Sequence, residues 1–174
     1  MSFYHFTTRI KMSFHQQLKS KIVTKENALQ TINKAKQNGK KIVFTNGCFD
    51  ILHPGHVDYL SQARDLGDLL ILGLNTDNSV KRLNKAPNRP INKEQERAMV
   101  LAALGFIDLI VLFDEETPYD LINFLQPNVL VKGNDYKAEE IVGYDIVTAN
   151  GGKVITIPFL EGFSTSNLIK KILS

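Results

Sequence analysis

The chain of 174 residues lacks several features that mark particular classes of protein. It has one cysteine, Cys48, no tryptophan, and no apolar run close to the roughly 20 residues that a membrane-spanning helix needs. A single cysteine excludes an internal disulfide, so a reducing compartment is expected, with the cytoplasm as the default. The first residues also lack the apolar segment of a secretory signal peptide.

Acidic residues are missing from the N-terminal part of the chain. Residues 1–25 carry five basic side chains and no acid, so the remainder has a net charge of 3 − 5 = −2. Dedicated nucleic-acid binders carry their positive charge on a folded surface, so this distribution argues against one. We expect residues 1–24 to form a basic tail before a domain of residues 25–174. The tail is expected to be disordered, or else translation begins at Met12. A mitochondrial transit peptide has a similar composition and stays an alternative.

Apolar runs alternate with helical patterns along the rest of the chain. Strands are expected at 41–46, 68–74, 106–113, 128–133 and 153–158. Helices are expected at 25–40, 54–66, 93–105, 117–126, 138–152 and 164–174, and a long polar loop at 75–92. This alternation predicts an α/β fold: a Rossmann-like, doubly wound, five-stranded parallel sheet with helices on both faces. Ligands of such sheets bind beyond the carboxyl ends of the strands.

Two histidines follow the first of these strands, in the sequence HPGH at residues 53–56. Residues three apart share a helix face, and the first turn of a helix favours an anion through its free N–H groups and its dipole. Gly55 leaves room for a phosphate to approach the main chain. The pattern therefore predicts a polyphosphate site. A structural zinc site lacks ligands at standard spacing here, and a buried Cys48 is commoner than a nucleophilic one.

With these residues in view, GCFDILHPGH resembles the HxGH signature of the cytidylyltransferase-like nucleotidyltransferases. The similarity continues through NTDNSVKRLNKAPNRPINKEQERAMVLAAL, PNVLVKGNDY, IVGYDIVTANGGKVITIP and GFSTSNLIKKI. Together these blocks resemble the adenylyltransferase domain of the bacterial ADP-heptose synthesis enzymes. The resemblance covers about residues 25–173.

The resemblance implies transfer of AMP from ATP to D-glycero-β-D-manno-heptose 1-phosphate, a sugar 1-phosphate, with release of pyrophosphate. The nucleophile is a phosphate oxygen that is already ionised, so positioning and charge neutralisation carry the catalysis. Mg²⁺ would be held mainly by the triphosphate, with no metal site of the protein's own. Family analogy suggests a homodimer as an expectation, and neither a nucleic acid nor a membrane is expected as a partner.

The resemblance also assigns roles to residues of this chain. It implies that His53 and His56 contact the triphosphate and stabilise charge at the α-phosphorus. Lys81 and Arg89, in the polar loop after the second strand, are candidates to grip phosphates. The expected nucleotide-binding residues are Thr45, Asn46, Gly47, Phe49, Asp50, Gly55, Lys132, Gly133, Asn134, Asp135, Gly162, Ser164, Thr165 and Ser166. Ser166 replaces the usual threonine of the G-x-S-T-T turn, and Asn134 replaces the second glycine of KGGDY.

Several assignments stay open on the sequence alone. Lys85 is a further candidate for phosphate contact. Arg97 either forms a local salt bridge or points towards the site, and Asp77 either orients the sugar or caps a turn. One alternative function is a glycerol-3-phosphate or phosphoethanolamine cytidylyltransferase, which would share the phosphate-handling residues. The other is a non-catalytic nucleotide-binding module, which the intact histidines and the STS hydroxyls disfavour.

Overall fold

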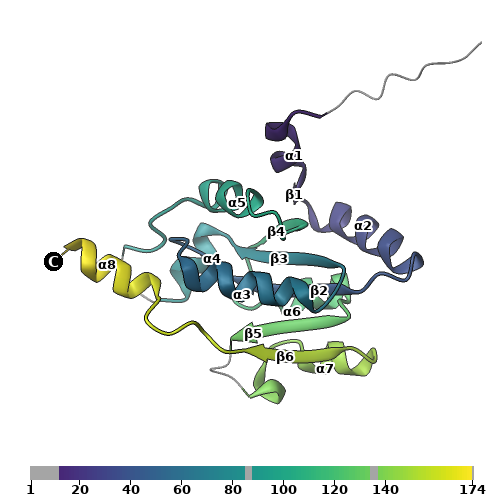
Figure 1. Cartoon of the computed structure of the whole chain (residues 1–174). Coiled ribbons are helices and arrows are strands. Elements are labelled where there is room, and N and C mark those ends of the chain that lie inside the picture. The colour runs from purple at the N-terminus through teal and green to yellow at the C-terminus, as the bar shows by residue number, and fades with distance from the viewer. Residues whose placement is uncertain (1–11, 85–87, 134–136, 174) are drawn as a thin grey trace, which may run out of the picture.

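Six parallel strands lie side by side at the centre of the molecule, in the order β1-β4-β3-β2-β5-β6 (Figure 1). The computed structural model describes residues 12–84, 88–133 and 137–173. The strands are β1 (Ile22–Val23), β2 (Ile42–Gly47), β3 (Leu69–Asn75), β4 (Leu109–Phe113), β5 (Val129–Gly133) and β6 (Lys153–Ile157). The predicted Rossmann-like parallel sheet is confirmed, with six strands in place of five.

The additional strand lies in the segment predicted as a tail. Helix α1 (Phe14–Ser20) begins with a capping box formed by Ser13 and Gln16, and β1 then pairs with β4 through Ile22 and Ile110. The sequence pattern missed β1 because two residues are too few to show a strand periodicity. The predicted domain boundary at residue 24 stays a prediction.

Helices cover both faces of the sheet. They are α2 (Lys25–Gln37), α3 (Pro54–Asp65), α4 (Asp77–Arg82), α5 (Glu94–Ala102), α6 (Tyr119–Leu125), α7 (Tyr144–Ala149) and α8 (Thr165–Leu173), with a short 3₁₀ helix η1 (Ala138–Glu140). None of the described helices is both long enough and apolar enough to cross a membrane.

Two of the predicted elements were wrong in detail. The expected loop 75–92 contains α4, whose N-cap Thr76 accepts a hydrogen bond from the backbone of Ser79. The expected helix 138–152 is divided into η1 and α7, because Gly143 between them has φ +91°, which is incompatible with a continuing helix. Helices of one to two turns bury too short a stripe to stand out from a polar sequence.

Strand side chains alternate between two hydrophobic layers. On one face, Val43 and its neighbours pack against Leu60 of α3 and Leu101 of α5. On the other, Ile42 and Phe44 pack with residues of α2, α6 and α7, among them Ile32 and Ile122. A sheet covered on both faces requires strands that are apolar at consecutive positions, which explains the continuous apolar runs of the sequence.

The strand order reverses direction between β2 and β5. The chain passes from β2 to β3 and β4 on one side, and then crosses to β5 and β6 on the other. β2 pairs with β3 over six residues but with β5 only at Val43 and Phe44. The carboxyl ends of β2 and β5 therefore diverge, and this is the position where open α/β sheets bind ligands.

Candidate functional site

A cavity of about 430 Å³ lies at this divergence. Its walls come from the carboxyl ends of β2 and β5, the start of α3, the segment before α5, and the segment that leads into α8. The lining residues are Asn46, Gly47, Cys48, Phe49, His53, Gly55, His56, Tyr59, Arg89, Lys132, Gly133, Phe159, Leu160, Phe163, Ser164, Thr165 and Ser166.

The two histidines of the HPGH sequence stack on each other in this cavity. His53 is the N-cap of α3, and Pro54 occupies the first turn, where a missing N–H costs nothing. The ring centroids of His53 and His56 are 3.7 Å apart with an interplanar angle of 20°. The Nδ1 atoms of both rings are buried and have no hydrogen-bond partner among the described residues. Buried polar atoms are normally satisfied, so this pair is prepared for a ligand.

Both imidazoles are held in the neutral form. Burial lowers the pKa of His53. Burial also lowers the pKa of His56 to about 4, with further contributions from His53 and Arg89, against a hydrogen bond with the Ile51 backbone that raises it. Charged imidazolium is disfavoured in a dry site unless an anion compensates it. A polyanion is the ligand that would supply this compensation.

Two cationic side chains complete the polar wall. Arg89 Nε donates to Asp50 Oδ2 at 2.9 Å, and the Arg89 side chain is only 11% exposed. Lys132, near the end of β5, donates from Nζ to Asn46 Oδ1 at 2.9 Å and so spans the gap between the two diverging strands. Positive charge at the diverging ends of β2 and β5 favours the binding of phosphate groups.

The first turn of α8 faces the same cavity. The Ser164 side chain accepts a hydrogen bond from the Asn167 backbone at 3.1 Å, so Ser164 caps the start of α8. Phe163 packs against Gly55: a Cβ at Gly55 would lie 3.1 Å from Phe163 Cβ and 3.2 Å from the His53 ring. The absence of a side chain at Gly55 therefore lets the C-terminal segment close over the histidine pair.

The ring of Phe49 packs against the histidine pair through His56. Phe49 has φ +45°, an unusual conformation for an aromatic residue, and its ring meets His56 edge-on with centroids 5.1 Å apart. The same ring occupies the space that a Cβ of Gly47 would need. Such backbone strain persists when the surrounding packing enforces it, and it is common at functional sites.

Most of the predicted site residues meet at this cavity. His53, His56 and Arg89 line it, as do nine of the expected nucleotide-binding residues: Asn46, Gly47, Phe49, Gly55, Lys132, Gly133, Ser164, Thr165 and Ser166. Their individual roles stay predictions.

Four predicted residues lie elsewhere in the structure. Thr45 is buried beneath the cavity, where its hydroxyl pairs with Tyr59 Oη at 2.7 Å. Asp50 is buried against Arg89. Lys81 is exposed on α4, and Gly162 forms a turn before α8 at φ +84°. None of these four is among the residues that line the cavity. Lys85, Asn134 and Asp135 lie outside the described residues.

Sequence reasoning missed five lining residues, Cys48, Tyr59, Phe159, Leu160 and Phe163, as contributors to the cavity. Three of them are exposed apolar side chains: Phe159 is 56%, Leu160 41% and Phe163 43% exposed. The signal was present, because FLEGF follows the last strand at the ligand edge of the sheet. Apolar and aromatic side chains beside cations are suited to holding a nucleobase.

The two residues that the sequence left open are joined to each other. The Arg97 side chain is fully buried and donates from Nη2 to Asp77 Oδ1 at 2.8 Å. Arg97 therefore forms the local salt bridge rather than reaching the cavity.

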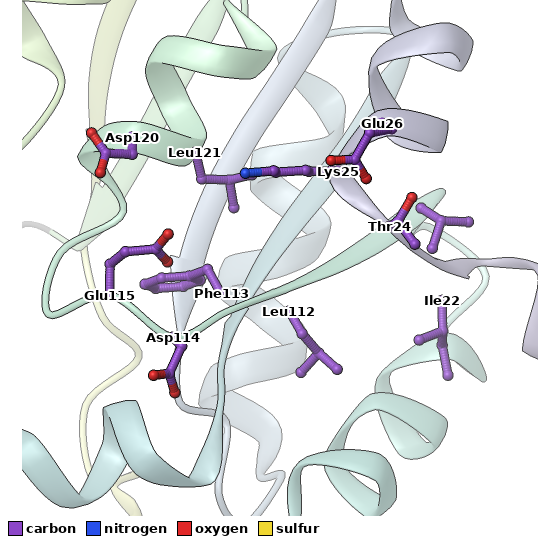
Figure 2. Close-up of a pocket in the computed structure, with 11 residues that line it drawn as sticks. Ile22, Thr24, Lys25, Glu26, Leu112, Phe113, Asp114, Glu115, Asp120 and Leu121 are labelled. Carbon is purple, nitrogen blue, oxygen red and sulfur yellow. The ribbon is translucent and has the colours of Figure 1, made fainter.

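A second hollow, of about 530 Å³, lies at the carboxyl ends of β1 and β4 (Figure 2). Its lining combines apolar side chains such as Leu112 and Phe113 with four carboxylates, Glu26, Asp114, Glu115 and Asp120. These negative charges would repel a triphosphate. The cavity at the diverging carboxyl ends of β2 and β5 is therefore the candidate nucleotide site.

Metal ligands are scarce in the described residues. They contain no group of three or more His, Cys, Asp or Glu side chains placed to hold a metal ion. The cavity instead offers imidazoles, a guanidinium, an ammonium, hydroxyls and the start of a helix. This donor set suits a polyphosphate that brings its own cation.

Comparison with known proteins also points to a nucleotide-binding site. Residues 44–171 match the family model described as Cytidylyltransferase-like. The chain is 54% identical over 154 residues to the "Bifunctional protein HldE" of Syntrophotalea carbinolica, covering 88% of this chain and 31% of that protein. It is 57% identical over 152 residues to the protein of the same name from Campylobacter jejuni, covering 87% of this chain and 31% of that protein. The chain thus spans about a third of these relatives.

One solved structure is also similar. It is the "lipopolysaccharide core biosynthesis protein from Thermoplasma volcanium", with a TM-score of 0.57 and 28% sequence identity. The match covers 70% of this chain and 97% of that protein.

Proposed function

The chain belongs to the cytidylyltransferase-like family, and from this premise we propose that it transfers a nucleotidyl group from a nucleoside triphosphate to a sugar phosphate. The observation that carries the proposal is the stacked pair of neutral histidines, His53 and His56, beside Arg89 and Lys132 in one cavity. These donors, two of them positively charged, favour binding of a triphosphate over binding of a neutral ligand.

The reaction exchanges one phosphate ester for another. An oxygen of the acceptor phosphate forms a bond to the α-phosphorus, while the bond from that phosphorus to the bridging oxygen of the β-phosphate breaks. Pyrophosphate leaves with the bonding electrons. The nucleophile is ionised at neutral pH, so no activated side chain is needed, and catalysis consists of positioning and stabilising charge.

Each part of the cavity has a role in this scheme. The imidazoles of His53 and His56 donate hydrogen bonds to the phosphate oxygens as negative charge develops. Arg89 and Lys132 neutralise the phosphate chain, and the first N–H groups of α8 bind a further phosphate oxygen. Phe159 and Phe163 offer apolar surface to the nucleobase.

The proposed substrates are ATP and D-glycero-β-D-manno-heptose 1-phosphate, which would give ADP-heptose and pyrophosphate. Support comes from the motif blocks of the sequence, from identities above 50% to proteins named HldE, and from the similarity to a lipopolysaccharide core biosynthesis protein. A bacterial cell would use such an activated heptose in building the core of its lipopolysaccharide.

The nucleotide would bring Mg²⁺ with it, and that ion would supply charge neutralisation at the triphosphate. The proposed location is the cytoplasm, where ATP is abundant and a lone thiol such as Cys48 stays reduced. A homodimer remains a prediction from family analogy.

The test is a measurement of pyrophosphate release with Mg²⁺, crossing ATP and CTP against heptose 1-phosphate and glycerol 3-phosphate. Turnover only with ATP and the heptose is expected. Turnover with CTP and glycerol phosphate would keep the chemistry and overturn the substrates. Nucleotide binding without turnover in any of the four mixtures would favour a non-catalytic nucleotide-binding module.

A further inference from the structure

The carboxylate of Asp50 is fully used within the protein. Oδ2 accepts from Arg89 Nε at 2.9 Å, while Oδ1 accepts from the backbone N–H of Ile91 at 2.7 Å and of Asn92 at 3.0 Å. The side chain is 0% exposed. Both oxygens are therefore committed to the segment of residues 89–92, and neither is available to a nucleotide.

A second buried side chain holds the same segment from the other side. The guanidinium of Arg97 donates to the Asn92 carbonyl at 3.0 Å, to the Cys48 carbonyl at 2.7 Å and to Asp77 Oδ1 at 2.8 Å. Asn92 Nδ2 also donates to the Asp50 carbonyl at 2.6 Å. The loop after β2, the start of α4 and the segment before α5 are thus joined by one hydrogen-bonded network.

Arg89 is the member of this network that reaches the cavity. It lines the cavity with the histidine pair, and Nε is the only atom of its side chain that makes a hydrogen bond within the described residues. A guanidinium is planar, so an anchor at Nε fixes the plane and the direction of both terminal NH₂ groups. These two groups can then bind phosphate oxygens as a fork.

We infer that Asp50 and Arg97 are positioning residues, which orient Arg89 so that its terminal NH₂ groups grip the transferring phosphate. Asp50 acts on the reaction only through Arg89, and Arg97 acts by holding the loops that Asp50 and Arg89 occupy. This inference rests on the proposed function for its catalytic part. It differs from a role of Asp50 as a direct ligand of nucleotide or metal, because that role requires a free carboxylate oxygen.

A double-mutant cycle tests the dependence of Asp50 on Arg89. Asp50→Asn keeps an acceptor for the backbone N–H groups but removes the charge that anchors Arg89. Arg89→Ala should lower kcat by about 10²-fold, the cost of losing one transition-state donor, and Asp50→Asn should come close to it. The double variant should be no worse than Arg89→Ala, since residues that act as one unit are not additive. A double variant reduced by about 10⁴-fold would overturn the inference.

A second variant separates orientation from charge. Arg89→Lys retains the positive charge but has no Nε anchor and no fork. If orientation matters, its kcat should fall nearly as far as that of Arg89→Ala, with KM for ATP changed less than kcat. A lysine variant with wild-type kcat would overturn the inference. This test does not depend on Asp50→Asn being folded, because Arg89 lies at the cavity wall and the substitution is conservative.

Asp68 supplies a matched control. Its carboxylate also accepts from a cationic side chain, Lys40 Nζ at 3.0 Å, and from a backbone N–H, that of Lys41 at 2.8 Å. It precedes β3 at the opposite end of the sheet. Asp68→Asn should leave kcat and KM unchanged, so an equal loss in Asp68→Asn and Asp50→Asn would mean that the effect is general to such carboxylates and overturn a positional role.

Binding measurements keep this inference separate from the proposed reaction. If the wild-type protein releases no pyrophosphate in any substrate mixture, the proposed function fails. Calorimetric titration with Mg–ATP then tests the positioning role separately. Asp50→Asn should weaken Mg–ATP binding as much as Arg89→Ala does, and the double variant should not weaken it further. A crystal structure of Asp50→Asn with Arg89 still in its original position would contradict the positioning role in either case.

Discussion

At the scale of single residues, the site depends on two imidazoles that are kept uncharged until a ligand arrives. Burial disfavours their protonation, and the 3.7 Å stack makes two positive charges there costlier still. A neutral pair does not repel the neighbouring Arg89, so the cavity can hold all three nitrogen donors together. In the proposed reaction these donors would act where charge develops in the transition state.

Replacing either histidine should therefore affect turnover more than folding. We expect His53→Ala and His56→Ala to lower kcat by about 10²–10³-fold. Steady-state pyrophosphate release measures the loss, and circular dichroism checks the fold. His15→Ala is the control, because His15 is exposed on α1, away from the cavity. Turnover unchanged in both cavity variants would exclude the proposed phosphate contacts.

The lowered pKa of His56 also predicts a pH dependence of stability. The folded protein resists protonation until the pH approaches 4, whereas the unfolded chain takes up the proton near 6.5. The unfolded state therefore binds more protons between these values, and the free energy of unfolding should fall as the pH drops from 7 to 5. The contribution of His56 is about 2 kcal/mol. Urea titrations of the wild type and His56→Ala at both pH values measure it, and an identical pH effect in the two proteins would contradict it.

At the scale of elements, the start of α3 packs closely against the segment before α8, and this contact leaves no room for a side chain at Gly55. Gly55→Ala would put a methyl group 3.1 Å from Phe163 Cβ and 3.2 Å from the His53 ring, so one of them must move. We expect kcat/KM to fall by less than about 10²-fold, the cost of a misplacement of about 1 Å, because a smaller movement relieves these contacts. Overpacking at this buried position opposes the higher helix propensity of alanine, so the free energy of unfolding is measured beside kcat/KM. Gly105→Ala is the control, since nothing lies within 4 Å of its added methyl; an equal loss there would refute the steric explanation.

Local patterns in the sequence predicted the local parts of the structure. The HPGH spacing predicted that His53 and His56 lie together at the start of a helix, and the two rings do stack there, with His53 as the N-cap of α3. The pair of Asp50 and Arg89 is separated by 39 positions and depends on how the chain folds back, which no periodicity reveals. The contact of Phe163 with Gly55 is of the same kind. The sequence therefore identified most residues of the site but not which of them support the others.

At the scale of the whole molecule, the sheet extends further than the matched family region. β1 and α1 lie outside residues 44–171, yet Ile22 and Leu18 pack against the core beneath α5. Lys21 also donates from Nζ to the Leu104 carbonyl at 3.1 Å and accepts from the Ile110 backbone at 2.8 Å. This N-terminal segment therefore contributes to the stability of the sheet's edge.

The stability contribution can be measured with one pair of variants. Ile22→Ala removes half-buried apolar surface and should lower the free energy of unfolding by about 1–3 kcal/mol. Val100→Ala is the control, because Val100 is 51% exposed and should cost no more than about 0.5 kcal/mol. Chemical denaturation gives both values. Equal effects would mean that β1 adds nothing to the fold.

The neutral histidine pair has a calorimetric consequence. A triphosphate in contact with His53 and His56 raises their affinity for protons, since an opposite charge favours the charged form. Near pH 6 the protein should therefore take up protons as ATP binds, drawing them from the buffer. The observed binding enthalpy should then change with the ionisation enthalpy of the buffer, with a positive slope equal to the number of protons absorbed. His56→Ala should reduce that slope, because one of the two imidazoles that take up a proton on nucleotide binding is then missing.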